Sequence, residues 1–321
     1  MTQFIFDTNY YRNYVVDKDF KEFQSNIFEQ KKIENQKNYE IVFPIISAIE
    51  LLNHLNDNNS TAKICFNALN LMVNHCGNII NGKRKGTVVP SFYNLLTMYF
   101  FQTTSENHIF NNNIFSLSQT VANSLDYNVI KTIENEINQV IKIKREEREN
   151  IIHNLQEFYL KSLNNKEEID WYIFQKNPAL KKELQELIKN KKIHKLVGLS
   201  FIDLAMKQAN KDEIKISQSE FENNFVDSHF KVSIDFFVKH IVSNMINIEK
   251  MEYFFKPETD SKKRWNSFYD MQLIFAVEFE NFKNRNTIFV TEERKIRDCF
   301  KINGKENLAI SLVQYENLLK T

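Results

Sequence analysis

Four carboxylates in this sequence stand at comparable places beside short apolar runs. Asp7 follows Phe4-Ile5-Phe6, Glu50 lies in PIISAIELLNHL, Asp270 lies in SFYDMQLIFAVEF, and Glu293 occurs in IFVTEERKIR. If these runs belong to one parallel α/β sheet, the acids converge on the edge where such sheets bind ligands. Carboxylates held close together repel one another, and a divalent cation neutralises such a cluster. The pattern therefore predicts a metal site.

Three of these acids also have a structural interpretation that needs no ligand. Asp7 fits an Asx turn at the end of a strand. Glu50 completes the Ser-x-x-Glu pattern of a helix capping box that starts at Ser47. Glu293 favours the start of a helix behind Thr291 through the helix dipole. Each acid taken alone is therefore a weaker signal than the four together.

Asp270 is harder to explain without a ligand, because Ile274 and Val277 lie four and seven positions further on. Its carboxylate sits on an apolar helical row, where an unpaired charge is costly. Asp203 in GLSFIDLAMKQANKDEIKIS is a rival for the third acid, since it also precedes an apolar helical pattern and a short strand-like run. Asp270 is preferred because the strand pattern NTIFVTEE follows it at once.

Strands and helices at the two ends of the chain would position these acids. TQFIFDTN, YEIVFPII, NTIFVTEE and NLAISLVQY read as strands, with helices before the later ones and a final turn at ENLLK. Alternating strands and helices predict right-handed crossovers and a parallel sheet. Strand signals are sparse from about residue 60 to 260, where helical spacing prevails. We expect an α/β fold: an α/β/α core of residues 1–59 and 262–321, with an all-α insertion over 60–261.

Composition narrows the class of protein. The chain has 321 residues, 42% of them hydrophobic, and its 5 Gly and 4 Pro favour long helices. The net charge of +1 predicts no nucleic-acid partner by itself. Three cysteines without a CxxC spacing predict free thiols in a reducing compartment. No apolar run reaches membrane-spanning length and no signal segment is present, so we expect a cytoplasmic protein without a membrane partner. GxGxxG, P-loop and HExxH motifs are absent.

The blocks FIFDTNYYRNYV, FPIISAIELLNHL, FYDMQLIFAVEF and IFVTEERKIR resemble the four conserved blocks of the PIN domain nucleases. That family has a parallel sheet flanked by helices and cleaves single-stranded or structured RNA with magnesium or manganese. The resemblance implies that Asp7, Glu50, Asp270 and Glu293 are the catalytic acids and the ligands of Mg²⁺ or Mn²⁺. It covers about residues 1–59 and 262–321.

The resemblance also implies roles for these residues. Asp7 and Asp270 would bind the principal cation, and Glu50 and Glu293 would hold bridging waters or a second ion. A water activated by the metal would then attack the phosphodiester in line. The polar residues matched to the family, which would orient the carboxylates or the phosphate, are Asn9 and Thr291. One helical turn further on, Arg12 would meet the scissile phosphate or form a surface salt bridge.

The chain departs from the family pattern at two points. The fourth acid of the family is usually aspartate, whereas this chain has Glu292-Glu293, so either glutamate would face the metal. Asp298 is a weaker substitute. The separation between the second and third acids is also far longer than is usual in the family, which leaves the choice between Asp270 and Asp203 open.

Local basic segments in the predicted insertion would bind the RNA backbone. NGKRKG places Lys83, Arg84 and Lys85 on a tight loop bounded by glycines, and KNPALKKELQELIKNKKIHK is rich in lysine. Such segments neutralise phosphates, although a solvated helix face accounts for them equally well.

The sequence thus predicts a metal-dependent endoribonuclease, a hydrolase of toxin-like or defence type, with RNA as its partner. A PIN-like module without catalysis that binds RNA or protein is the alternative. The sequence leaves open the choice of RNA over DNA, the oligomeric state, and whether a protein partner inhibits the site.

Overall fold

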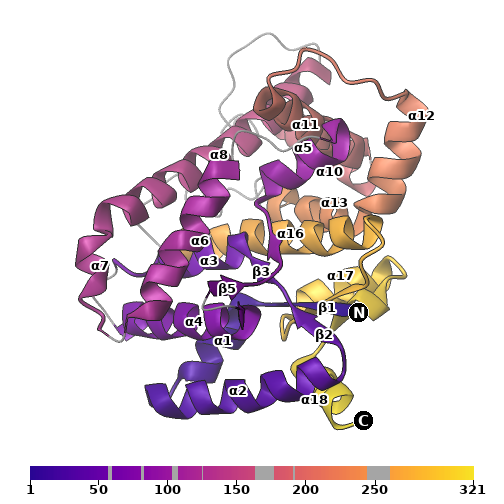
Figure 1. Cartoon of the computed structure of the whole chain (residues 1–321). Helices are drawn as coiled ribbons and strands as arrows, with labels where there is room; N and C mark the ends of the chain where they lie inside the picture. Colours follow the sequence, from indigo (N-terminus) through magenta and orange to yellow (C-terminus); the bar gives the residue numbers. More distant parts are fainter. Residues whose placement is uncertain are drawn as a thin grey trace. The chain divides into compact units, whose positions relative to one another are not determined.

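The computed structural model describes residues 1–56, 60–80, 83–102, 108–124, 126–162, 177–190, 192–243 and 261–321 (Figure 1). The strands are β1 (Thr2–Phe6), β2 (Tyr39–Ile41), β3 (Phe43–Pro44), β4 (Asn78–Ile80), β5 (Lys83–Lys85), β6 (Val88–Val89), β7 (Thr287–Val290) and β8 (Ala309–Ile310). The helices up to residue 162 are α1 (Thr8–Val15), α2 (Phe20–Gln36), α3 (Ile45–Leu52), α4 (Ser60–Cys76), α5 (Phe92–Phe101), α6 (His108–Asn123), α7 (Val129–Thr132) and α8 (Glu134–Ser162). The later ones are α10 (Pro178–Lys189), α11 (Lys192–Ala209), α12 (Gln218–Glu220), η1 (Phe221–His229), α13 (Lys231–Phe237), η2 (Val238–Val242), α16 (Ser261–Phe282), α17 (Arg294–Ile302), η3 (Glu306–Leu308) and α18 (Leu312–Lys320).

The chain divides into two compact units. Unit 1 comprises residues 1–92, 107–144 and 279–321, and unit 2 comprises residues 93–106 and 145–278. Unit 1 contains both ends of the chain and the sheet that they form. It also takes in α4 and α6, which belong to the segment that the sequence assigns to the helical insertion.

A parallel sheet of four strands, in the order β2-β1-β7-β8, organises unit 1. In its centre, Phe6 on β1 is in register with Val290 on β7. Phe4, Ile5 and Phe6 are all buried, because a parallel sheet covered on both faces needs apolar side chains at every position. The α/β class and the parallel pairing predicted from the sequence are confirmed.

The last predicted strand, NLAISLVQY, is mostly wrong. Only Ala309 and Ile310 form β8, and the chain then enters α18. Ser311 is the reason: its hydroxyl accepts a hydrogen bond from the backbone of Gln314, whose side chain accepts one from the backbone of Ser311. This capping box starts a helix where the apolar pattern favoured a strand.

The capping box predicted at Ser47 and Glu50 is also wrong. The helix α3 already begins at Ile45, directly after Pro44, so Ser47 lies inside it and Glu50 lies in its last turn. The segment 60–261 is likewise not purely helical, since it contains β4, β5 and β6. The predicted loop at Lys83–Lys85 is the strand β5, paired antiparallel with β4.

A buried polar network ties together the helices of unit 1. The Glu34 carboxylate lies 3.0 Å from Nε2 of His75 and accepts hydrogen bonds from the Tyr315 hydroxyl at 2.6 Å and from Gln30 at 2.7 Å. Burial alone would raise the pKa of Glu34, but His75 and these hydrogen bonds outweigh burial and lower it. The hydroxyl of Tyr11 also lies 3.2 Å from Nδ1 of His75. The network links the helices α1, α2, α4 and α18.

Unit 2 is built from closely packed helices. Gly198 on α11 lies so near η1 that an added Cβ would come within 2.8 Å of Phe221 and 2.9 Å of Val226. The buried Glu278 carboxylate accepts hydrogen bonds from the backbone amides of Val232 and Ser233 at the start of α13. The stacked rings of Phe230 and Phe275 lie 4.1 Å apart. In the described part of this unit, burial comes from such contacts between helices.

The three cysteines are free, as predicted from their number and spacing. Cys65, Cys76 and Cys299 are also all buried. Along the described ranges, every helix is too short or too polar to cross a bilayer.

Candidate active site

Asp7 stands at the carboxyl end of the central strand β1. It is the N-cap of α1, and its Oδ1 accepts a hydrogen bond of 3.1 Å from the backbone amide of Asn9. The turn predicted as its structural role is therefore present. Only 4% of the residue is exposed, which is unusual for an aspartate whose sole task is to cap a helix.

Thr291 holds the other oxygen of Asp7 from the neighbouring strand. Its hydroxyl donates a hydrogen bond of 2.6 Å to Oδ2 of Asp7, and it accepts one of 3.0 Å from the backbone amide of Glu293. The strand register produces this contact. Since Phe6 pairs with Val290, the residues that follow them, Asp7 and Thr291, lie opposite each other. Two strands far apart in sequence thus fix one carboxylate.

Glu293 joins the same group through Asn9. The Asn9 side-chain amide donates a hydrogen bond of 3.3 Å to Oε1 of Glu293, which stands at the N-cap position of α17 without capping it. The structure therefore brings together Asp7, Asn9, Thr291 and Glu293, as the sequence predicts from the first and fourth blocks. The helix starts of α1 and α17 meet at this edge of the sheet.

The electrostatic surroundings make the charged form of Asp7 costly. Burial is the main cause that raises its pKa, and the nearby charge of Glu293 raises it further. The hydrogen bonds from Thr291 and Asn9 and the charge of Lys295 lower the pKa but do not outweigh burial. Within the described ranges, Asp7 forms no ion pair with a cationic side chain.

Glu292 and Glu293 have different surroundings, and the difference indicates which of the two glutamates would face a metal beside Asp7. Glu292 accepts a hydrogen bond of 2.6 Å from the backbone amide of Leu312 and lies 3.7 Å from Nη1 of Arg297. It therefore binds a free amide in the first turn of α18, and its side chain is mostly exposed. Glu293 is the one hydrogen-bonded to Asn9.

The remaining predicted acids lie on the helices α3, α11, α16 and α17. Glu50 is buried in the last turn of α3, in unit 1. Asp270 is buried on α16, in the part that belongs to unit 2, and its role as a ligand stays a prediction. Asp203, also in unit 2, forms an ion pair of 2.7 Å with Lys207. Asp298 lies 3.5 Å from Arg294 on the exposed side of α17.

The predicted basic residues also have defined positions. Arg12 lies in the last turn of α1, in the same unit as Asp7, and is half-buried. Lys83, Arg84 and Lys85 form the strand β5. Their proposed contact with phosphate stays a prediction.

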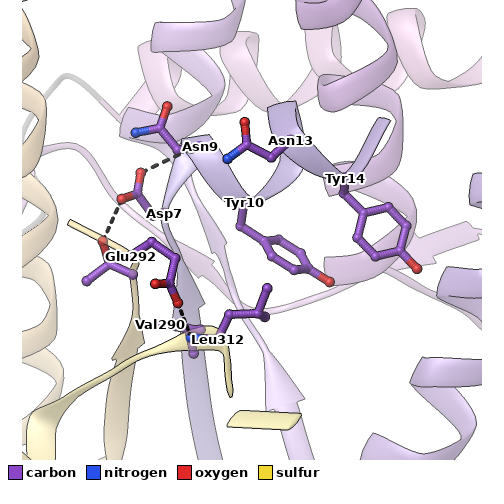
Figure 2. A pocket seen from close by; sticks show the side chains of 9 residues that line it. Asp7, Asn9, Tyr10, Asn13, Tyr14, Val290, Glu292 and Leu312 are labelled. Carbon is purple, nitrogen blue, oxygen red and sulfur yellow. Dashed lines mark hydrogen bonds between the residues drawn. The ribbon is translucent and has the colours of Figure 1, made fainter. Parts of the chain in front are cut away.

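A pocket of about 180 Å³ opens beside Asp7 (Figure 2). Its lining residues come from the end of β1, from α1, from β7 and the loop after it, and from the start of α18: Asp7, Asn9, Tyr10, Asn13, Tyr14, Val290, Thr291, Glu292 and Leu312. Sequence reasoning missed Tyr10, Asn13, Tyr14 and Leu312. A signal was present, because positions 9, 10, 13 and 14 follow the spacing of one helical face directly after the first acid.

The donor atoms around Asp7 suit a hard divalent cation. Each Asp7 oxygen accepts one hydrogen bond and retains a lone pair, since a carboxylate has about four acceptor sites. Glu293 adds a second carboxylate. The described residues contain no group of three His, Cys, Asp or Glu side chains arranged to hold a metal ion. Two carboxylates are nevertheless enough for Mg²⁺, which keeps several waters and binds substrate phosphates directly.

Comparisons of the chain with protein-family models, curated proteins and solved structures find no match.

Proposed function

We propose that this protein is a metal-dependent nuclease that hydrolyses phosphodiester bonds in RNA. The observation that carries the proposal is the Asp7 carboxylate. It is buried at the carboxyl end of a central parallel strand, it lies next to the charge of Glu293, and no cationic side chain of the described residues pairs with it. A bound divalent cation would offset both the burial and the repulsion.

The residues of this chain would divide the work as follows. Asp7 and Glu293 would hold the cation, with Glu50 and Asp270 as the further acids that the sequence resemblance implies. When bound, the cation lowers the pKa of a coordinated water and offsets charge on the phosphate. Thr291 fixes the orientation of Asp7, so that its carboxylate needs little rearrangement when substrate arrives.

Single-stranded or structured RNA is the proposed substrate, and Mg²⁺ or Mn²⁺ is the proposed cofactor. Local positive charge for the RNA backbone would come from Lys83, Arg84 and Lys85 and from the lysine-rich segment 176–195. A toxin-like or defence role, with a protein partner that inhibits the site, belongs to the same proposal.

The second candidate is a binding module for RNA or protein without catalysis. One observation favours it: Asp7 already caps α1 through the Asn9 amide, so that a purely structural role accounts for an acid at this position. The capping role does not explain why the residue is buried beside Glu293. We therefore rank the nuclease first.

Cleavage of a mixed pool of labelled structured and single-stranded RNA tests the proposal. Wild-type protein is compared with Asp7→Asn and Asp270→Asn in Mg²⁺, in Mn²⁺ and in EDTA, and a DNA pool is run beside it. Asp298→Asn is the matched control, because Asp298 is exposed and paired with Arg294. We expect metal-dependent cutting that both site variants lose and the control keeps. Cutting that persists in Asp7→Asn would contradict the proposal, and an inert wild type would favour the binding module.

A further inference from the structure

The pocket beside Asp7 has the size of a site for one ring system. Its volume of about 180 Å³ is below the range of about 300–1,000 Å³ that drug-sized ligands and cofactors occupy. Asp7 and Thr291 line one end of it. A group that fills the pocket therefore lies next to the carboxylate that would hold the cation.

Aromatic and aliphatic side chains form much of the lining of this pocket. The Tyr10 ring is held firmly, since its centre lies 4.5 Å from that of Phe6 and its hydroxyl donates a hydrogen bond of 3.3 Å to Gln30. The Tyr14 ring lies 5.6 Å from Tyr10 and is only partly buried. Leu312 adds an aliphatic surface from α18 (Figure 2). Such a lining favours a flat, apolar ring over a hydrated ion.

Two amides on α1 line the pocket together with this aromatic surface. Asn9 and Asn13 are four positions apart, and both line the pocket (Figure 2). Asn13 is exposed to solvent. A side-chain amide offers both donors and an acceptor, which match the polar edge of a nucleobase. The pocket thus combines a stacking surface with groups that pair with a heterocycle.

A positive charge lies beside the aromatic lining of the pocket. The Nζ of Lys18 lies 3.9 Å from the centre of the Tyr14 ring. This ammonium group would meet a phosphate next to a bound base. A neutral apolar ligand would make no use of it.

We propose that this pocket binds one unpaired nucleobase of single-stranded RNA, stacked on Tyr14 and contacted by Asn13. The proposal rests on the nuclease function proposed above and adds how the substrate is chosen: the base next to the cleaved phosphate must be unpaired. Single-stranded RNA is recognised by bases that stack on aromatic rings and present their polar edges to side chains. A base inside a duplex cannot enter a pocket of this size.

Binding in the absence of metal tests the inference apart from cleavage. Anisotropy of an end-labelled single-stranded RNA is measured in EDTA for wild type, Tyr14→Ala, Tyr14→Phe and Asn13→Ala. Stacking of one base contributes about 1–3 kcal/mol, so Tyr14→Ala should weaken binding by about 5- to 150-fold, while Tyr14→Phe keeps most of the affinity. Asn13→Ala, an exposed change that leaves the fold intact, should reduce discrimination among homopolymers.

Phe28→Ala is the matched control. Phe28 is an exposed ring in the same unit, and Lys32 lies 4.6 Å from its centre, much as Lys18 lies over Tyr14. We expect this variant to bind as wild type does. An RNA with a single abasic nucleotide at the cleaved position should bind wild type as weakly as the intact RNA binds Tyr14→Ala.

The outcomes separate this inference from the proposed function. Affinity lost in Tyr14→Ala with no cutting by wild type would support the base pocket and overturn the nuclease. Metal-dependent cutting with Tyr14→Ala and Asn13→Ala equal to wild type would overturn the pocket and leave the nuclease standing. Equal binding of a duplex of the same sequence, or no RNA binding at all, would also overturn the pocket.

Discussion

Replacing Asp7 with asparagine tests whether this carboxylate binds a cation. The shapes of the two side chains are nearly equal. The asparagine oxygen can still accept from the backbone amide of Asn9, and its amide can still donate to the hydroxyl of Thr291. The substitution therefore removes the negative charge and retains the local hydrogen bonds. Any change in metal response reports on the charge itself.

The size of the effect follows from mass action. A cation present at about 100 times its dissociation constant stabilises the folded state by about 2.7 kcal/mol. For a cooperative unit of the size of unit 1, about 1 kcal/mol moves Tm by roughly 2–4 °C, so Mn²⁺ should raise the Tm of wild type by roughly 5–10 °C. Asp7→Asn should lose most of this rise. In metal-free buffer the variant should unfold at the same temperature as wild type or above it, since a buried charge has been removed.

Thermal unfolding followed by far-UV circular dichroism measures both effects, with protein stripped in EDTA and then titrated with MnCl₂. Asp298→Asn should keep the full rise, because Asp298 is half-exposed and pairs with Arg294. If Asp7→Asn shows the same rise as wild type, Asp7 is not a ligand and the reasoning from its burial is wrong. If wild type shows no rise at saturating Mn²⁺, the fold binds no cation and the binding module is the better description.

Of four further predictions, one concerns the site and three concern buried residues of unit 1. Asn9→Ala removes the hydrogen bond to Glu293 and should lower metal-dependent cleavage by about 10- to 100-fold, and cleavage at the rate of wild type would refute the supporting role of Asn9. Tyr315→Phe removes a hydrogen bond to the buried Glu34 carboxylate and should lower the free energy of unfolding in urea by about 1.5–3 kcal/mol. The pKa of Glu34 is lowered in the folded state, so its charge stabilises the protein at neutral pH. This stability should be lost as the pH falls below about 4.5 and through the pKa of the folded state. Urea titrations over this range should therefore show a smaller loss of unfolding free energy in Glu34→Gln than in wild type. Burial raises the pKa of the Cys76 thiol to about 12, so mass spectrometry of native protein treated with iodoacetamide near neutral pH should find Cys76 unmodified.

The local patterns of the sequence predicted the elements that carry the site. The run Phe4-Ile5-Phe6 is β1, the run before Thr291 is β7, and both acids that follow these strands are where the pattern placed them. Both runs are short, rich in aromatic and β-branched side chains and bounded by polar residues that form turns, which favours a buried strand over a helix. The strand predicted from the apolar pattern of NLAISLVQY is cut short at Ser311, because the capping box of this residue competes with strand formation.

The tertiary structure decided the contacts of the site. The hydrogen bond between Thr291 and Asp7 joins residues 284 positions apart, and no local propensity determines which strands pair or in which register. Burial of Asp7 and the side-by-side placement of Asn9 and Glu293 follow from that pairing. The sequence alone determined which residues follow β1 and β7. Only the packing of β1 against β7, driven by burial of both strands in one sheet, decided which of those residues meet.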